Sequence, residues 1–396
     1  MKSQRILSID IFRGLTIFLM VFVNELAGVS NIPQWMKHVP ATVDGMTFVD
    51  VVFPAFLFIV GMAIPFAVMN RIARGQRSFD FWQHVLTRTF GLLVLGVYMV
   101  NSGEMNAEAS LINHSWWAAL LYISAILIWN RYPKTDEKLK RFLFIGLRII
   151  GVVVLIILYF LYRKTGPDGQ LSGMTPSWWG ILGLIGWAYL LSIILFMVAN
   201  KNLTALITLF VLLFAVLLGL RSDYEFLPSF MVWLEGQAGH IAHTLVTLCG
   251  IICSLLLMKD GVLEQPMNKI RNMVALGILL GFAAYFSQPF GGISKIAATP
   301  SWALYSAAIC CFVFPAIYWL VDLKGFKSWA NFLKPAGENP LLTYILPPLF
   351  YATVGYAFIP AFLSSGFPGF IRAIVFSLFI LWIAKWLTQK GIRLHL

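Results

Sequence analysis

Long apolar runs separated by short polar connections dominate the chain. A transmembrane helix needs about 20 apolar residues, and polar residues interrupt the first, third, eighth and eleventh of the runs. The pattern predicts an all-α, polytopic helical bundle of about twelve transmembrane helices, within a range of ten to twelve, in a single domain over residues 1–396. The twelve runs lie near 8–28, 48–69, 82–101, 112–130, 142–161, 178–199, 203–220, 238–258, 272–288, 301–321, 339–357 and 369–388.

Composition supports an integral membrane protein. Charged residues make up 12% of the chain and hydrophobic residues 59%, whereas soluble domains carry about 25% charged residues. The alternating ten-residue segments typical of membrane β-barrels are not visible. The first run contains Asp10 and Arg13, and no small-residue cleavage site follows it. We therefore expect it to be a retained span and not a signal peptide.

The distribution of basic residues predicts an orientation. Of the 29 Lys and Arg residues, 20 fall in connections on the side of Met1 and five fall on the opposite side. Basic residues accumulate on the cytoplasmic side of membrane proteins. Both termini are therefore predicted to be cytoplasmic, and the first loop, near residues 29–47, extracytoplasmic. The net charge of +12 then reflects membrane topology, and we predict no nucleic-acid partner.

The first run carries ionisable and amide side chains at membrane depth. Such groups cost about 2.5–3.5 kcal/mol each on insertion scales. Asp10 and Arg13 are three residues apart, so they share a helix face and can pair. Asn24 is fourteen residues beyond Asp10, about 21 Å along a helix axis, which places it near the outer end. An interhelical hydrogen bond is the structural alternative for Asn24.

The second polar cluster is "WMKHVPATVDGMTFVD", residues 35–50, which joins the first two runs. Asp44 is a plausible N-cap for the second helix, whereas Asp50 lies deeper and is harder to explain by capping. A lone interfacial histidine such as His38 is more often structural than catalytic. His240 and His243 share a helix face, but no third ligand is indicated, so no metal site is predicted.

Other polar residues lie in loops on both sides of the membrane. Glu235, Ser294 and Lys295 belong to two outer loops, and we expect these loops to close a polar pocket together with the first loop. On the cytoplasmic side, Lys324 and Lys327 suit the phosphates of a ligand or anionic lipid headgroups. The pattern leaves both alternatives open.

Several motifs resemble a known family. The blocks run in order from residue 5 to about residue 345: "RILSIDIFRGLTIFLMVFVNELAG", "KHVPATVDGMTFVDVVFPAFLFIVG", "ISKIAATPSWAL" and "GENPLLTYI". They resemble the transmembrane acyltransferases related to heparan-α-glucosaminide N-acetyltransferase and their bacterial homologues. The sequence departs from the family pattern in the fourth run, where "SWWAALLYISAILIWN" replaces an expected block, and over residues 142–220.

The resemblance implies transfer of an acetyl group from cytoplasmic acetyl-CoA to an extracytoplasmic sugar or glycan acceptor, classically an amino sugar. It aligns His38 with the family's active-site histidine and Asn24 with its essential asparagine. Asp50 is then predicted to hold the imidazole in its reactive tautomer, which completes the catalytic set. The predicted donor-binding residues are Arg13, Ser294, Lys295, Lys324, Lys327 and Asn339, and the predicted acceptor-binding residues are Asp44, Glu235 and Trp302.

Predictions also follow for the membrane in which the protein lies and for the route of the acetyl donor. We expect a multi-pass protein of a bacterial inner membrane, with the lipid bilayer as partner and a homodimer as an open option. The hydrocarbon core is about 30 Å thick, which exceeds the reach of the pantetheine arm. The donor is therefore expected to enter a waist lined by the first, second and eighth to eleventh runs.

Three other functions remain open. A secondary transporter for a sugar or peptidoglycan fragment fits twelve spans, but it predicts internal repeats, which the chain lacks. An O-acyltransferase for cell-surface glycans shares the Asp-x-x-Arg-Gly pattern of the first run. A catalytically inactive structural or lipid-binding protein is the third alternative. Whether His38 acts as a base or accepts the acetyl group also stays open.

Overall fold

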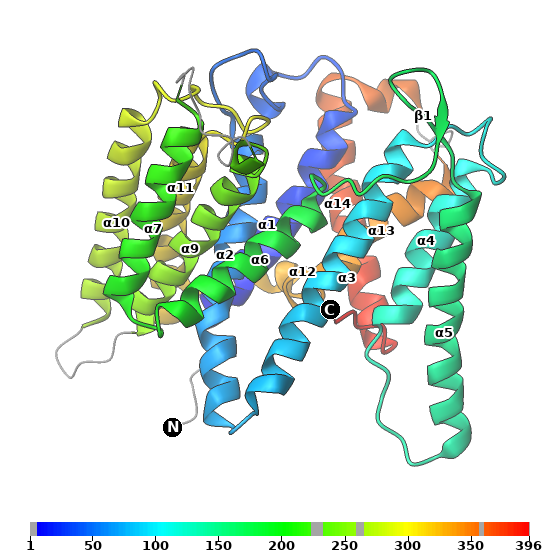
Figure 1. Ribbon diagram of the computed structural model, residues 1–396, viewed down its shortest axis with the longest axis horizontal. Coiled ribbons are helices and arrows are strands. Elements are labelled where there is room, and N and C mark those ends of the chain that lie inside the picture. Colours follow the sequence, from blue (N-terminus) through cyan, green and yellow to red (C-terminus); the bar gives the residue numbers. More distant parts are fainter. Residues whose placement is uncertain (1–5, 223–232, 259–264, 356–359, 396) are drawn as a thin grey trace. The chain divides into compact units, whose positions relative to one another are not determined.

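The computed structural model of the protein describes residues 6–222, 233–258, 265–355 and 360–395. Helices dominate these residues (Figure 1), and a two-residue antiparallel ladder, β1 (Lys164–Thr165) with β2 (Leu171–Ser172), lies in one loop. The α-helices are α1 (Leu7–Ala27), α2 (Phe48–Ala73), α3 (Ser78–Glu104), α4 (His114–Trp129), α5 (Lys138–Leu161), α6 (Ile181–Val198), α7 (Leu203–Leu220), α9 (Ala238–Met258), α10 (Pro266–Phe286), α11 (Pro300–Tyr318), α12 (Lys334–Glu338), α13 (Pro340–Val354) and α14 (Gly366–Gln389). Shorter 3-10 and π segments are η1 (Gln34–Met36), η2 (Trp319–Leu323), η3 (Ser328–Leu333) and η5 (Ala361–Ser364).

The predicted fold class is confirmed, because each of the twelve apolar runs coincides with one helix. Within the described residues, ten helices are long and apolar enough to cross a membrane, while α4 and α13 have 16 and 15 residues. The ten long helices fall within the predicted range of ten to twelve. Of the four runs with polar residues, the eleventh is the one that forms a shorter helix, α13, which ends before Gly355, whose φ is +80°.

The chain divides into two compact units, and each unit draws on three separate stretches. Unit one comprises Met1–Leu19, Pro33–Thr89 and Ile185–Lys334. Unit two comprises Met20–Ile32, Phe90–Leu184 and Pro335–Leu396. The helices α1, α3 and α6 contribute residues to both units. The single domain expected over residues 1–396 stays a prediction.

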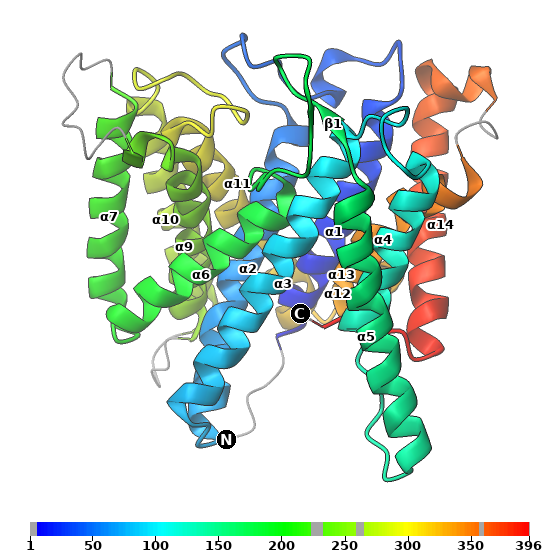
Figure 2. The same cartoon turned by 45° about the vertical axis from the view of Figure 1, so that its right-hand side comes forward.

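Unit one is built around a close crossing of α2 and α9, with α7, α10 and α11 beside them (Figure 2). A Cβ added at Gly61 would overlap the carbonyl oxygen of Thr247, and one added at Gly250 would overlap that of Phe58. Membrane helices pack through small residues, because lipid supplies no hydrophobic drive for their association. This backbone-to-backbone contact holds the body of α2, the helix that carries Asp50, against α9.

Unit two contains α4, α5, α13 and α14, together with the outer end of α1. Glu25 of α1 is 8% exposed. Its carboxylate accepts a hydrogen bond from the Tyr351 hydroxyl (2.7 Å) and lies 3.6 Å from the Arg372 guanidinium. These partners offset the cost of a buried charge.

We expect Gly61→Ala to destabilise the protein by about 1–3 kcal/mol, because the added methyl meets a backbone atom that cannot rotate away. The measurement is the apparent melting temperature of purified protein in one detergent. Gly281→Ala in α10 is the control, because a Cβ there meets nothing within 4 Å. Equal losses in the two variants would contradict the close crossing.

Candidate active site

The first turn of α2 organises the loop that precedes it. Thr47 is the N-cap, with φ −111° and ψ 177°. Its N–H donates to Oδ2 of Asp50 (3.0 Å), and its hydroxyl donates to the Lys37 carbonyl (2.8 Å). A carboxylate at the third helical position characteristically reaches back to the N-cap N–H. The expectation that Asp44 caps this helix is therefore wrong, because α2 begins three residues later than that role requires.

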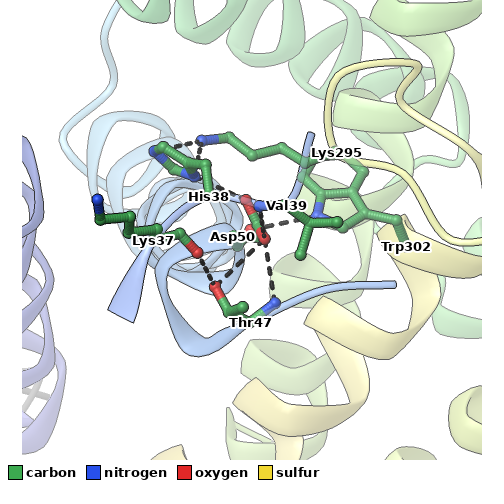
Figure 3. A network of polar contacts seen from close by, with 7 residues as sticks. All are labelled: Lys37, His38, Val39, Thr47, Asp50, Lys295 and Trp302. Carbon is green, nitrogen blue, oxygen red and sulfur yellow. Dashed lines mark hydrogen bonds and ion pairs between the residues drawn. The ribbon is translucent and has the colours of Figure 1, made fainter. Parts of the chain in front are cut away.

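The Asp50 carboxylate is the centre of the polar network in Figure 3, and only 1% of it is exposed. Oδ1 lies 2.7 Å from His38 Nδ1. Oδ2 accepts from the Val39 N–H (3.3 Å), in addition to the N-cap N–H. The indole Nε1 of Trp302 donates to the Asp50 carbonyl oxygen (3.1 Å). The first turn of a helix also favours a negative charge, so the site is built to hold an ionised carboxylate.

This network determines what the imidazole can do. An ionised carboxylate only accepts hydrogen bonds, so the proton between the two groups sits on His38 Nδ1. In the neutral imidazole, the Nε2 atom then keeps its lone pair. The His38 side chain is 39% exposed, in contrast to its buried partner. A reachable imidazole with an oriented lone pair can take a proton or attack a carbonyl carbon. The role predicted for Asp50 is consistent with this contact and stays a prediction.

Lys295 approaches the same imidazole from the loop between α10 and α11. Its Nζ lies 3.2 Å from Nδ1 and 3.3 Å from Nε2 of His38 (Figure 3). Burial lowers the pKa of Lys295 from its usual value, while the negative charge of Asp50 raises it. Lys295 was predicted to bind the donor, and the structure places it beside the candidate catalytic histidine.

Hydrogen bonds join the first outer loop to the α10–α11 loop, whereas the polar pocket predicted there stays a prediction. Oδ1 of Asp44 accepts from the Ile293 N–H (2.6 Å), and the Gly45 N–H donates to the Ile293 carbonyl (2.9 Å). Gly292 has φ +66°, and a Cβ there would lie 3.0 Å from the Asp44 carboxylate. The Ser294 hydroxyl accepts from the Ala297 N–H (3.2 Å). Asp44 and Ser294 therefore hold the loops in place, and their predicted ligand contacts stay predictions.

Aromatic side chains pack beside the hydrogen-bond network of Asp50. His243 of α9 is buried, and its ring centroid lies 5.5 Å from those of Phe53 and Trp302. In the sequence, His243 stood out only because it shares a helix face with His240. Phe53 follows Asp50 by three residues, and this helical spacing is the signal that could have linked them. No group of three or more His, Cys, Asp or Glu side chains in the described part of the chain is arranged to hold a metal ion.

The other predicted residues of unit one are more dispersed. Arg13 pairs with Asp10 at 3.1 Å on α1. Lys324 places Nζ 5.4 Å over the ring of the tryptophan that begins η2. Lys327 is the exposed N-cap residue of η3, and Glu235 is exposed just before α9. These four residues come from separate parts of the unit, which are α1, the segment before α9 and the connection from η2 to η3.

Two predicted asparagines belong to unit two. Asn24 is exposed near the outer end of α1. Asn339 is buried, and its amide donates to the Thr388 hydroxyl (3.1 Å) and the Ile392 carbonyl (2.9 Å). The Asn339 oxygen accepts from the Leu394 N–H (3.1 Å). Asn339 therefore anchors the C-terminal segment in this structure, and its donor contact stays a prediction.

Comparison with known proteins gives two kinds of match. A family model described as "Domain of unknown function (DUF5009)" matches residues 5–236. The chain is 36% identical over 188 residues to heparan-alpha-glucosaminide N-acetyltransferase of Mus musculus, covering 45% of this chain and 24% of that protein. It is 38% identical over 98 residues to the Homo sapiens protein of the same name, covering 24% of this chain and 14% of that protein. The chain thus aligns with less than a quarter of either relative.

We expect Asp50→Asn to lower the pKa of Lys295 further, because the variant removes the negative charge that favours the ammonium form. The measurement is the pH dependence of Lys295 labelling by an amine-specific reagent, read by peptide mass spectrometry. Half-maximal labelling of the unmodified protein should fall below pH 10.5. Asp80→Asn, an exposed aspartate in the first turn of α3, is the control. An unchanged or raised Lys295 pKa in Asp50→Asn would overturn this electrostatic account.

Proposed function

Because the chain belongs to the family of the domain of unknown function DUF5009 and aligns in part with two N-acetyltransferases, we propose that it is a transmembrane acetyltransferase. It moves the acetyl group of cytoplasmic acetyl-CoA to an extracytoplasmic amino sugar or glycan, in a bacterial inner membrane. The observation that carries the proposal is the contact between the buried Asp50 carboxylate and the accessible His38 imidazole, at 2.7 Å.

In direct transfer, the acceptor amine attacks the thioester carbonyl carbon while His38 Nε2 takes the amine proton. The tetrahedral intermediate collapses, the carbon–sulfur bond breaks, and the imidazolium returns that proton to the leaving CoA sulfur. Asp50 stabilises the transient imidazolium through Nδ1–H, as a carboxylate does in a catalytic triad. Atoms and charge balance, since one amide and one thiol replace one amine and one thioester.

In the alternative route, His38 Nε2 first accepts the acetyl group and then passes it to the acceptor. Asp50 would serve this route equally well, because it contacts only Nδ1. We favour direct transfer, in which the donor and the acceptor meet at His38 in one ternary complex. Lys295 Nζ lies 3.3 Å from Nε2, so in either route the group that approaches Nε2 shares that space with the ammonium.

Lys295 and Asn24 are proposed to stabilise the charge that develops during the reaction. An ammonium beside the imidazole suits the negative oxygen of the tetrahedral intermediate. The amide of Asn24, assigned from the family resemblance, supplies a second donor or orients the acceptor. Lys324 and Lys327 remain proposed contacts of the CoA phosphates, to which exposed ammonium groups bind as point charges.

We expect His38→Ala to lower acceptor-dependent CoA release by about two to four orders of magnitude, the usual contribution of a general base. The assay uses purified protein in liposomes with acetyl-CoA, and free thiol is the readout. Glucosamine, N-unsubstituted muropeptide sugars and a hydroxyl-only sugar serve as acceptors. His114→Ala is the control, because His114 lies at the start of α4 and bonds the Ser102 carbonyl.

Full activity in His38→Ala would refute the assignment of His38. A different result would favour a transporter. In that case no acceptor promotes CoA release by the unmodified protein, and labelled sugar enters the liposomes without CoA. Release with the hydroxyl sugar alone would make the protein an O-acetyltransferase.

We expect Asn24→Asp to lower kcat by about 10²–10³-fold, the effect of removing one oxyanion donor, with little change in KM for acetyl-CoA. The control is Asn113→Asp, because Asn113 is the N-cap of α4 and aspartate caps helices equally well. Steady-state kinetics of both variants provide the test. An Asn24→Asp variant with raised KM and unchanged kcat would show a ground-state binding role instead.

A further inference from the structure

A cavity of about 480 Å³ lies at the start of α5, in unit two. The connection from α4 and the first three turns of α5 form its walls. No residue of the proposed acetyl transfer belongs to it. The charged and aromatic side chains of its lining are Tyr132, Lys134, Asp136, Arg141, Phe144 and Arg148.

Several contacts hold the aromatic wall of this cavity in place. The ring of Tyr132 stacks on that of Phe144, with centroids 4.8 Å apart and an interplanar angle of 19°. The Tyr132 hydroxyl donates to the Leu127 carbonyl (2.9 Å). The guanidinium of Arg148 lies 5.3 Å from the Tyr132 ring centroid. A cation over an aromatic face is held in place by the ring quadrupole, so Arg148 is positioned before any ligand arrives.

Arg148 is the lining residue that lies farthest along α5. It is ten residues into α5, about 15 Å along the axis, and its Nη2 donates to the carbonyl of Asn130 at the end of α4 (3.3 Å). Figure 1 shows α5 continuing beyond the end of α4. A guanidinium has five N–H donors, so the remaining donors can bind an anion. The cavity thus lies where the shorter helix ends.

The charge of the cavity is cationic. Lys134, Arg141 and Arg148 contribute three positive charges, and Asp136 contributes one negative charge. Arg141 and Arg148 are seven residues apart on α5, so they lie on the same helix face, two turns apart. The nearby Glu137 does not neutralise them, because its carboxylate pairs with Lys140 at 2.8 Å.

The other faces of α5 carry bare apolar surface. Phe142 is 73% exposed and Ile149 is also exposed, and by helical spacing both lie about a quarter turn from the face of Arg141 and Arg148. Only 17% of the most apolar window of α5 is buried inside the protein. A lipid whose headgroup enters the cavity can therefore place its acyl chains along an apolar flank of the same helix.

We propose that this cavity binds the headgroup of an anionic phospholipid of the cytoplasmic leaflet, with the acyl chains along α5. The phosphate meets Lys134, Arg141 and Arg148, as basic pockets beside transmembrane helices bind acidic lipids. The positive-inside distribution places this end of α5 at the cytoplasmic surface. A soluble phosphate ester shares the headgroup chemistry but gains nothing from the exposed apolar residues, so lipid is the favoured source.

The test titrates delipidated full-length protein in detergent with dioleoyl phosphatidylglycerol, and with dioleoyl phosphatidylcholine for comparison, and counts bound lipids by native mass spectrometry. We expect phosphatidylglycerol to bind more tightly. Two double variants, Lys134→Gln with Arg141→Gln and Arg141→Gln with Arg148→Gln, should each weaken it at least tenfold and leave phosphatidylcholine unchanged. The first pair spares Arg148, which also contacts the protein itself. Lys138→Gln, on the same helix and outside the cavity lining, is the control and should bind as the unmodified protein does.

Equal affinity for the two lipids, or unchanged phosphatidylglycerol binding in both double variants, would overturn the proposal. Adenosine 3′,5′-diphosphate provides the second arm. If this nucleotide displaces phosphatidylglycerol at equal concentration, the cavity is a soluble phosphate site and the lipid assignment fails. None of these outcomes depends on acetyl transfer, because each readout is binding.

Discussion

The site depends on one constraint: the carboxylate of Asp50 is buried, so neighbouring groups have to supply its hydrogen bonds. A buried charge without partners costs several kcal/mol, so the surrounding backbone is arranged around it. The N-cap N–H, the N–H of Val39 and the imidazole of His38 all point at its two oxygens. The conformation of the loop before α2 that satisfies the carboxylate is therefore also the one that delivers the imidazole.

The rest of unit one supports this arrangement from three directions. The close crossing at Gly61 and Gly250 holds α2 against α9, and Trp302 of α11 donates to the Asp50 carbonyl. Asp44 joins the first outer loop to the α10–α11 loop through Ile293. Since that second loop carries Lys295, the same bond brings the ammonium to the imidazole. A rigid helix pair thus positions a reactive group that lies on a loop, as is common for functional residues.

Hydropathy predicted the twelve helices well. The thickness of the bilayer sets the length of each apolar run, and this length can be read directly from a single sequence. The links within the site were harder to predict. His38 and Asp50 are 12 residues apart across an irregular loop, where helical periodicity says nothing. Lys295 is 257 residues from His38, and no local rule connects them. Asp44 was misassigned as a cap because composition alone does not distinguish it from Thr47, which the helix uses.

Exposure separates the candidate catalytic pair from the other charged pairs of the membrane helices. Glu25 and Arg372 are both largely buried, at 8% and 15% exposure, and the Tyr351 hydroxyl completes that cluster. Such a pair neutralises itself and has little surface left for a substrate. In the Asp50–His38 pair the carboxylate is buried and the imidazole is reachable. In the first arrangement each partner offsets the cost of burying the other, whereas the second stabilises one partner and leaves the other exposed to react. That asymmetry is the physical reason for proposing His38 as the reactive group.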